Sequence, residues 1–144
     1  MRDYKKELED RVEFIRGVLR DSGASGIVYG NSGGKDSALV GALCKAACDN
    51  TVGIIMPCAS KRNFGLDRDD GLTVATHFGI ETREIDLSPV KEAMTAALSG
   101  VTELSDMGSA NINPRLRMTT LYAVAASENR LVAGTGNRSE AYLG

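Results

Sequence analysis

Short apolar runs alternate with segments of helical periodicity along most of the 144 residues. Apolar residues that recur every three or four positions predict amphipathic helices, whereas short apolar runs between glycine, proline or polar residues predict buried strands. The expected strands lie at 27–29, 51–56, 80–87 and 131–133. The expected helices lie at 3–21, 36–48, about 72–78, 88–98 and 113–129.

Proline marks the predicted start of two of these helices. Ser88-Pro89 and Asn113-Pro114 each place proline at a first helical position, where its missing N–H and fixed φ are tolerated. The stretch 99–110 is polar and is expected to connect the two helices.

The alternation of strand and helix predicts an α/β fold: a doubly wound parallel sheet with helices on both faces. No internal repeat or composition change divides the chain, so residues 1–144 are expected to form one domain. Ligands of open parallel sheets bind at the carboxyl ends of the strands, where the strand order reverses. Glycine-rich segments at 30–37 and 134–137 follow the first and fourth strands. They face each other if these strands are neighbours.

Composition and charge limit the classes of partner that the chain is expected to bind. The chain is 42% hydrophobic and 25% charged, as in a soluble globular domain, and its net charge of -2 favours neither nucleic acid nor an anionic membrane. No signal peptide or run of 18 apolar residues is visible. Three cysteines, an odd number, indicate reduced thiols and a cytoplasmic protein. They lack a fourth ligand at zinc-like spacing, which favours buried cysteines over a metal site.

The first glycine-rich segment has the features of a phosphate-binding loop. Gly33 and Gly34 let backbone N–H groups approach an anion, Ser32 and Ser37 add hydroxyls, and a helix N-terminus follows. The segment is not a Walker A loop, because Asp36 stands where that loop has serine or threonine.

Asp36 places a carboxylate beside the expected phosphates. The two charges would repel unless a cation such as Mg²⁺ lay between them. Glu140 follows the fourth strand and could reach the same crevice to complete a pair of metal ligands. The alternatives are that Asp36 caps the helix and that Glu140 is a solvent-exposed glutamate.

The motif Ser-Gly-Gly-x-Asp-Ser after a buried strand resembles the pyrophosphate loop of N-type ATP pyrophosphatases, which adenylate their substrates. The segments 134–140 and 111–118 resemble motifs of the NAD synthetase family within that group. The resemblance spans the chain and implies a homodimer. It implies Mg²⁺ ligands at Asp36 and Glu140 and a deamido-NAD contact at Arg115. The ATP-binding residues that it implies are Gly30, Asn31, Ser32, Gly33, Gly34, Lys35, Asp36, Ser37 and Thr135.

Four further residues have two interpretations each. Arg115 follows Asn113-Pro114, so it is expected in a first helical turn, where a cation is disfavoured unless an anionic ligand binds there; it could also be a surface arginine. The resemblance implies that Thr135 contacts ATP, but its position between two glycines is also typical of a turn residue. Lys61 and Arg62 either contact the nucleotide or are solvated loop charges.

The resemblance implies a carbon–nitrogen ligase. The nicotinate carboxylate of deamido-NAD would attack the α-phosphate of ATP to form an acyl-adenylate, and ammonia would displace AMP. Only 29 residues precede the loop, too few for a fused glutamine-hydrolysing domain, so free ammonia is the expected nitrogen donor unless a partner supplies it. Because family members continue beyond the equivalent of Gly144, this chain is expected to be the N-terminal part of the enzyme, with little turnover alone. The alternatives are a pyrophosphatase acting on a purine nucleotide or tRNA, a non-catalytic adenine-nucleotide-binding module, and an assembly domain.

Overall fold

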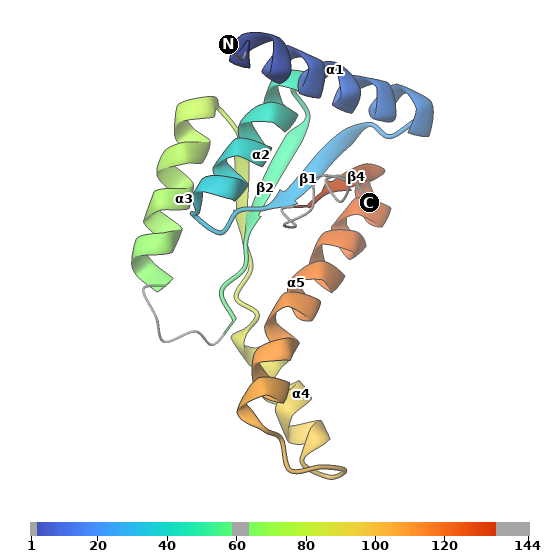
Figure 1. The fold of residues 1–144 in the computed structure, drawn as a ribbon. Helices are drawn as coiled ribbons and strands as arrows, with labels where there is room; N and C mark the ends of the chain where they lie inside the picture. Colours follow the sequence, from blue (N-terminus) through green and yellow to red (C-terminus); the bar gives the residue numbers. More distant parts are fainter. Residues whose placement is uncertain (1–2, 59–63, 135–144) are drawn as a thin grey trace.

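The computed structural model describes residues 3–58 and 64–134. Helices and strands alternate in the order expected from the sequence (Figure 1). The elements are α1 (Tyr4–Ser22), β1 (Gly26–Gly30), α2 (Lys35–Ala47), β2 (Thr51–Ile55), α3 (Phe64–Phe78), β3 (Glu81–Glu84), α4 (Ser88–Leu98), α5 (Asp106–Glu128) and β4 (Arg130–Ala133).

The four described strands form one parallel sheet in the order β3-β2-β1-β4. Val28 in β1 is aligned with Val52 in β2 on one side and with Val132 in β4 on the other. The chain moves outward from β1 to β3 and then returns to the opposite side of β1. The strand order therefore reverses between β1 and β4, and the first and fourth strands are neighbours, which the sequence had left open.

Each face of the sheet is covered by helices (Figure 1). Because side chains alternate along a strand, Val28 packs with Leu121 and Ala125 of α5, whereas Tyr29 packs with Val40 and Cys44 of α2. Helix α3 lies beside α2, and α1 packs across α2. The predicted doubly wound α/β fold is confirmed.

Strand β3 is shorter than the predicted strand at 80–87, although the chain continues alongside β2. The backbone N–H of Ile85 donates to Ile55 at 2.9 Å, and that of Leu87 donates to Pro57 at 2.7 Å. Leu87 is buried in the core on the α5 face. The apolar pattern thus identified the paired segment, of which only the first half is regular strand.

The predicted start of α5 at Asn113 is wrong, because the helix begins seven residues earlier, at Asp106. Ser105 caps it: its side chain accepts a hydrogen bond from the Gly108 N–H at 3.0 Å. Leu104 lies against Gly108 and supports this first turn. Pro114 is therefore inside the helix, where it removes one backbone hydrogen bond. The Ser105 cap decides the helix start, and proline position alone misled the prediction.

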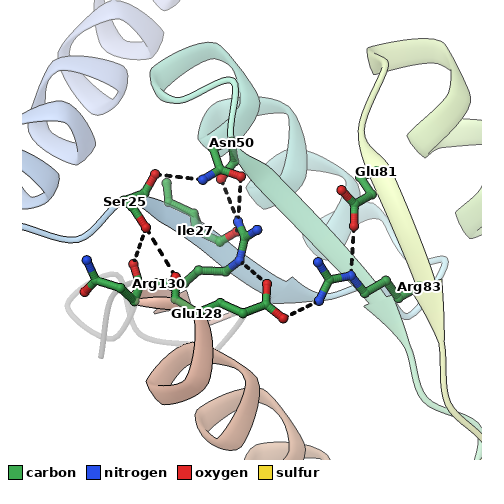
Figure 2. A network of polar contacts seen from close by, with 8 residues as sticks. Ser25, Ile27, Asn50, Glu81, Arg83, Glu128 and Arg130 are labelled. Carbon is green, nitrogen blue, oxygen red and sulfur yellow. Dashed lines mark hydrogen bonds and ion pairs between the residues drawn. The ribbon is translucent and has the colours of Figure 1, made fainter.

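A polar network joins both edges of the sheet near the amino ends of its strands (Figure 2). Glu128, the last residue of α5, accepts from Arg130 of β4 at 2.9 Å and from Arg83 of β3 at 2.6 Å. Arg130 also donates to the Asn50 carbonyl at 2.9 Å and to the Ile27 carbonyl at 3.4 Å. Glu128 thus connects the two edge strands, which β1 and β2 separate.

The network should make stability depend on pH. Hydrogen bonds from Arg83 and then Arg130 lower the pKa of Glu128 from 4.5 to about 2. Because the folded-state pKa is the lower one, this stabilisation is complete above pH 4.5 and is lost as the pH falls towards 2. Urea unfolding should therefore show that Glu128→Gln lowers the free energy of unfolding at pH 6 and loses most of this effect near pH 2. Glu103→Gln, on an exposed loop, is the control, and a pH-independent effect of Glu128→Gln would contradict the assignment.

Tyr29 fills a space between β2 and α2 that two glycines leave open. A Cβ atom at Gly53 would lie 2.9 Å from the Tyr29 hydroxyl, and one at Gly41 would lie 2.5 Å from it. Tyr29 is 1% exposed, and its hydroxyl has no hydrogen-bond partner among the described residues. Burial, followed by the nearby Cys44, raises the pKa of Tyr29 to about 12.

We expect Tyr29→Phe to stabilise the protein. The change removes a buried hydroxyl that makes no hydrogen bond to any described residue, and it keeps the ring, so the gain should be about 1 kcal/mol. Thermal unfolding of the variant and of Tyr122→Phe, whose tyrosine is 46% exposed, would measure it. A loss of stability in Tyr29→Phe alone would mean that the hydroxyl has a partner.

Candidate functional site

The loop between β1 and α2 lies at the carboxyl edge of the sheet, beside the point where the strand order reverses. Gly33 has a φ of 83°, a left-handed conformation that glycine adopts without strain. Gly34 is the N-cap of α2 and is extended, with a φ of -85°. The turn at Gly33 therefore leads the chain directly into the first turn of α2.

Two serines close the loop on itself. The Ser37 hydroxyl donates to the Gly34 carbonyl at 3.1 Å and accepts from the Ser32 N–H at 3.3 Å and the Ser32 hydroxyl at 3.2 Å. The Ser32 hydroxyl also accepts from the Gly34 N–H at 3.3 Å. All four contacts are longer than typical hydrogen bonds of their kind, so an anion that offers better acceptors could replace them.

The first turn of α2 supplies further donors. Across residues 3–58 and 64–134, the N–H groups of Lys35 and Asp36 have no hydrogen-bond acceptor. Such N–H groups and the positive end of the helix dipole form an anion site. Together with the two serine hydroxyls, they can hold a phosphate group at the end of β1.

Asp36 extends into solvent from this first turn. Its side chain makes no capping hydrogen bond or ion pair within the described part of the chain, which does not favour the alternative of a helix-capping aspartate. A free carboxylate beside an anion site suits a divalent cation, because Mg²⁺ prefers oxygen ligands and bridges carboxylate to phosphate. Asp36 therefore offers one ligand of the kind that the predicted Mg²⁺ requires.

Several predicted site residues cannot be placed. Thr135 and Glu140, and likewise Lys61 and Arg62, lie outside the described residues. Among the residues that are described, no group of three or more His, Cys, Asp or Glu side chains could hold a metal ion. A magnesium site at Asp36 would need ligands from elsewhere, such as Glu140 and the phosphates themselves.

Arg115 does not lie in a first helical turn, so that prediction is wrong. It is the tenth residue of α5, and its guanidinium donates to the carbonyl and side-chain oxygens of Asn111, both at 3.3 Å. Arg115 is exposed and lines a hollow of about 470 Å³ with Met118, Thr119 and Tyr122. In the described residues it makes no hydrogen bond or ion pair with the loop at 30–37.

Arg117 is the arginine of this motif that reaches the strand ends, a role that was not predicted from the sequence. Its Nε donates to the carbonyl of Met56, just after β2, at 2.9 Å. Asn113, one turn earlier, accepts from the Cys58 thiol at 3.4 Å. Leu121, one turn later, lies against Gly30. The four-residue spacing of these side chains was the available signal, because it places them on one face of α5.

The chain matches the family model of NAD synthase over residues 7–144. It belongs to the NAD synthase family. The NH(3)-dependent NAD(+) synthetase of Carboxydothermus hydrogenoformans is 41% identical over 145 residues, which cover 99% of this chain and 58% of that protein. The protein of the same name from Archaeoglobus fulgidus is 38% identical, with 99% and 57% covered. The chain thus spans a little over half the length of these relatives.

Solved structures of NAD synthase relatives share the fold. The NH3-dependent NAD synthetase of Campylobacter jejuni, in complex with the nitrate ion, superimposes with a TM-score of 0.85 at 31% identity; the match covers 97% of this chain and 59% of that one. The NMN synthetase of Francisella tularensis gives a TM-score of 0.86 at 31% identity, with 95% and 56% covered. The parallel sheet with its helices is therefore the adenine nucleotide alpha-hydrolase fold of the NAD synthase family.

Two further observations concern the helices and the cysteines of this member of the NAD synthase family. None of its described helices is both long enough and apolar enough to cross a membrane. Cys44, Cys48 and Cys58 are free thiols, and Cys44 and Cys58 are buried, as expected for cysteines that pack in a core. Burial raises the pKa of Cys44 to about 12.

Proposed function

We propose that this protein is the ATP-binding part of an ammonia-dependent NAD⁺ synthetase. The observation that carries the proposal is the loop after β1, where N–H groups that have no acceptor among the described residues converge with two serine hydroxyls and Asp36 at the strand-order reversal. Membership in the NAD synthase family supports the reaction, the ATP-dependent amidation of deamido-NAD to NAD.

The loop would work by holding the phosphates of ATP in place. The nicotinate carboxylate attacks the α-phosphorus, the bond to the bridging oxygen breaks, and pyrophosphate leaves with its electron pair. The N–H groups of Lys35 and Asp36 and the hydroxyls of Ser32 and Ser37 would stabilise the charge of this leaving group. Ammonia then attacks the acyl carbon and releases AMP and one proton.

Mg²⁺ would be held by Asp36 and, from outside the described residues, by Glu140. It would supply positive charge that stabilises the pyrophosphate leaving group. We further propose that five more residues border the ATP: Gly30, Asn31, Gly33, Gly34 and Thr135. In the sequence they follow the first and fourth strands, which are neighbours in the sheet.

Arg115 is proposed to bind the acceptor rather than ATP. It lies on the exposed side of α5, over a hollow with Met118 and Tyr122 that offers apolar surface beside a cation. This combination suits a nicotinate ring with its carboxylate or a nucleotide phosphate. Contact with ATP is less favoured, because α5 carries Arg115 and Arg117 in different directions.

The acceptor decides between two related functions. A relative of similar structure is named NMN synthetase, so the deamidated mononucleotide is a second candidate. The test incubates full-length protein with Mg-ATP, ammonia and either deamido-NAD or nicotinate mononucleotide, and measures pyrophosphate release and the amide product. Release that depends on deamido-NAD is the expected result. Dependence on the mononucleotide would indicate an NMN synthetase. Release only with a purine nucleotide or tRNA, added in two further arms of the assay, would indicate another ATP pyrophosphatase, and ATP binding without release would indicate a binding module.

We also propose a homodimer in which a second copy covers α4. No residue of α4 is buried, and Val90 and Met94 on this helix, together with Val101 and Met107 beyond it, are exposed. A helix with an apolar face normally buries that face. The same chemistry on a second copy makes an isologous contact possible.

Light scattering after size exclusion would test the dimer. Met94→Lys should weaken the dimer at least about tenfold, because it would bury a charge in an apolar contact. Glu92→Lys, on the other side of α4, should leave it unchanged. A monomeric wild-type protein, or a dimer indifferent to Met94→Lys, would contradict the proposal.

The location and the remaining partners are proposed from composition. Reduced thiols at all three cysteines suit the cytoplasm, and a net charge of -2 provides no field for nucleic acid or an anionic membrane.

A further inference from the structure

Asn31 connects the loop after β1 to helix α3. Its side-chain Nδ2 donates to the carbonyl of Gly71 at 3.0 Å, and its Oδ1 accepts from the N–H of Gly33 at 3.1 Å. Its own backbone N–H donates to Ile54 of β2 at 2.8 Å. One residue therefore links the loop, the neighbouring strand and a helix 40 residues further along the chain.

The space for this side chain depends on a glycine in α3. A Cβ atom at Gly71 would lie 2.9 Å from the Asn31 Oδ1 and 3.1 Å from its Cγ. Side-chain carbons do not approach other atoms so closely, so any larger residue at 71 would displace the amide. Gly71 and Asn31 are thus matched in shape as well as by their hydrogen bond.

Two kinds of hydrogen bond hold the loop. Those of the Asn31 side chain are 3.0 and 3.1 Å long, and Asn31 is 6% exposed. Those that the exposed Ser32 hydroxyl makes are 3.2 and 3.3 Å long. When a buried hydrogen bond breaks, its polar atoms cannot bond to water instead. We therefore expect the Asn31 bonds to persist when an anion binds, whereas the serine hydroxyls exchange their bonds within the loop for bonds to the anion.

The Asn31 bonds also set the direction of the free donors. The Gly33 N–H donates to the Asn31 side chain and is therefore not available to a ligand. The same hydrogen bond fixes the left-handed turn at Gly33. The chain then enters α2 with the N–H groups of Lys35 and Asp36 pointing out of the helix N-terminus. The anion-binding donors depend on the turn, and the turn depends on Asn31.

We propose that Asn31 is a positioning residue, which holds the Ser32-Gly33-Gly34 turn in its anion-binding form and anchors it to α3 at Gly71. The side chain would act on phosphate binding through the loop, without contacting the phosphate itself. This inference rests on the proposed function only in that the loop binds the phosphates of ATP.

The test compares a ligand that has phosphates with one that lacks them. Calorimetry with full-length protein would give dissociation constants for Mg-ATP, Mg-pyrophosphate and adenosine, and scanning calorimetry would give the melting temperature. The variants are Asn31→Ala, Asn31→Asp, Gly71→Ala and the double variant Asn31→Ala/Gly71→Ala. Asn31→Asp keeps an acceptor for Gly33 but loses the donor to Gly71.

We expect each Asn31 variant to weaken Mg-ATP and Mg-pyrophosphate binding at least about tenfold, as loss of one or two hydrogen bonds implies, with adenosine binding unchanged. Gly71→Ala should lower both phosphate affinity and melting temperature. In the double variant the clash is absent and alanine favours the helix, so the melting temperature should recover while phosphate affinity stays low.

Three results would overturn the inference. Mg-ATP binding by Asn31→Ala within twofold of wild type would show that the side chain is not needed. A parallel loss of ATP and adenosine affinity would show a general structural effect. If the wild-type protein binds Mg-ATP no more tightly than adenosine, the proposed binding of phosphate by the loop is wrong as well. This result distinguishes failure of the proposed function from failure of the Asn31 inference alone.

Discussion

Replacing Asp36 with asparagine should reduce Mg-ATP-dependent pyrophosphate release by about 10²- to 10³-fold, because a metal ion contributes several kcal/mol of charge stabilisation in the transition state. The variant keeps the size and polarity of the side chain and removes the charge that would bind Mg²⁺. Its fold should be retained, since the Asp36 side chain is exposed and makes no hydrogen bond in the described part of the chain. The loss of a favourable helix-dipole interaction costs only about 0.3–1 kcal/mol.

Asp49→Asn provides the matched control. Asp49 lies just beyond the other end of α2, with a fully exposed side chain that is 3.9 Å from Lys45. Removing that charge should leave pyrophosphate release unchanged. If Asp36→Asn retained wild-type activity at limiting Mg²⁺, the loop would have to bind phosphate without this carboxylate, and the proposed metal site would be wrong.

Replacing Arg130 with methionine should cause the largest loss of stability among the surface and edge variants. Arg130 has a side chain only 8% exposed, and it donates to Glu128 and to the carbonyls of Asn50 and Ile27. Methionine keeps the apolar length and removes every one of these bonds. Since hydrogen bonds to charged groups contribute about 1.5–3 kcal/mol, the melting temperature should fall by about 10 °C.

Arg16→Met tests whether the larger contribution of Arg130 to stability comes from its burial. Arg16 forms an ion pair with Glu13 on the exposed face of α1, where such pairs contribute less than about 1 kcal/mol. Thermal unfolding should therefore separate the two arginine variants clearly. Equal losses would mean that the network in Figure 2 contributes no more than a surface pair.

Residues close together in sequence were predicted well. The apolar runs predicted the four strands and their parallel arrangement, because a buried strand needs adjacent apolar residues and a parallel pair needs an intervening helix. The loop at 30–37 was also located correctly between β1 and α2. The roles of its residues in binding remain predictions, as do those of Thr135 and Glu140.

Errors arose where one local signal was preferred to another, and where the partner of a side chain lies far away in the sequence. Proline at 114 suggested a helix start, but the Ser105 cap begins the helix earlier. Arg115 was consequently assigned to a first turn in which it does not lie. Arg117 was overlooked because its partner, the carbonyl of Met56, is 61 residues away in the sequence.

The sequence by itself determined the order of strands and helices and the position of the glycine-serine loop with Asp36. These features follow from backbone preferences and apolar patterns that act over a few residues. Only the tertiary structure decided that β1 and β4 are neighbours, that Arg117 reaches the strand ends, and that Asn31 is held by Gly71. Each of these depends on which side chains fit together across the fold, and a buried amide or guanidinium is directed by its hydrogen-bond partners rather than by its sequence neighbours.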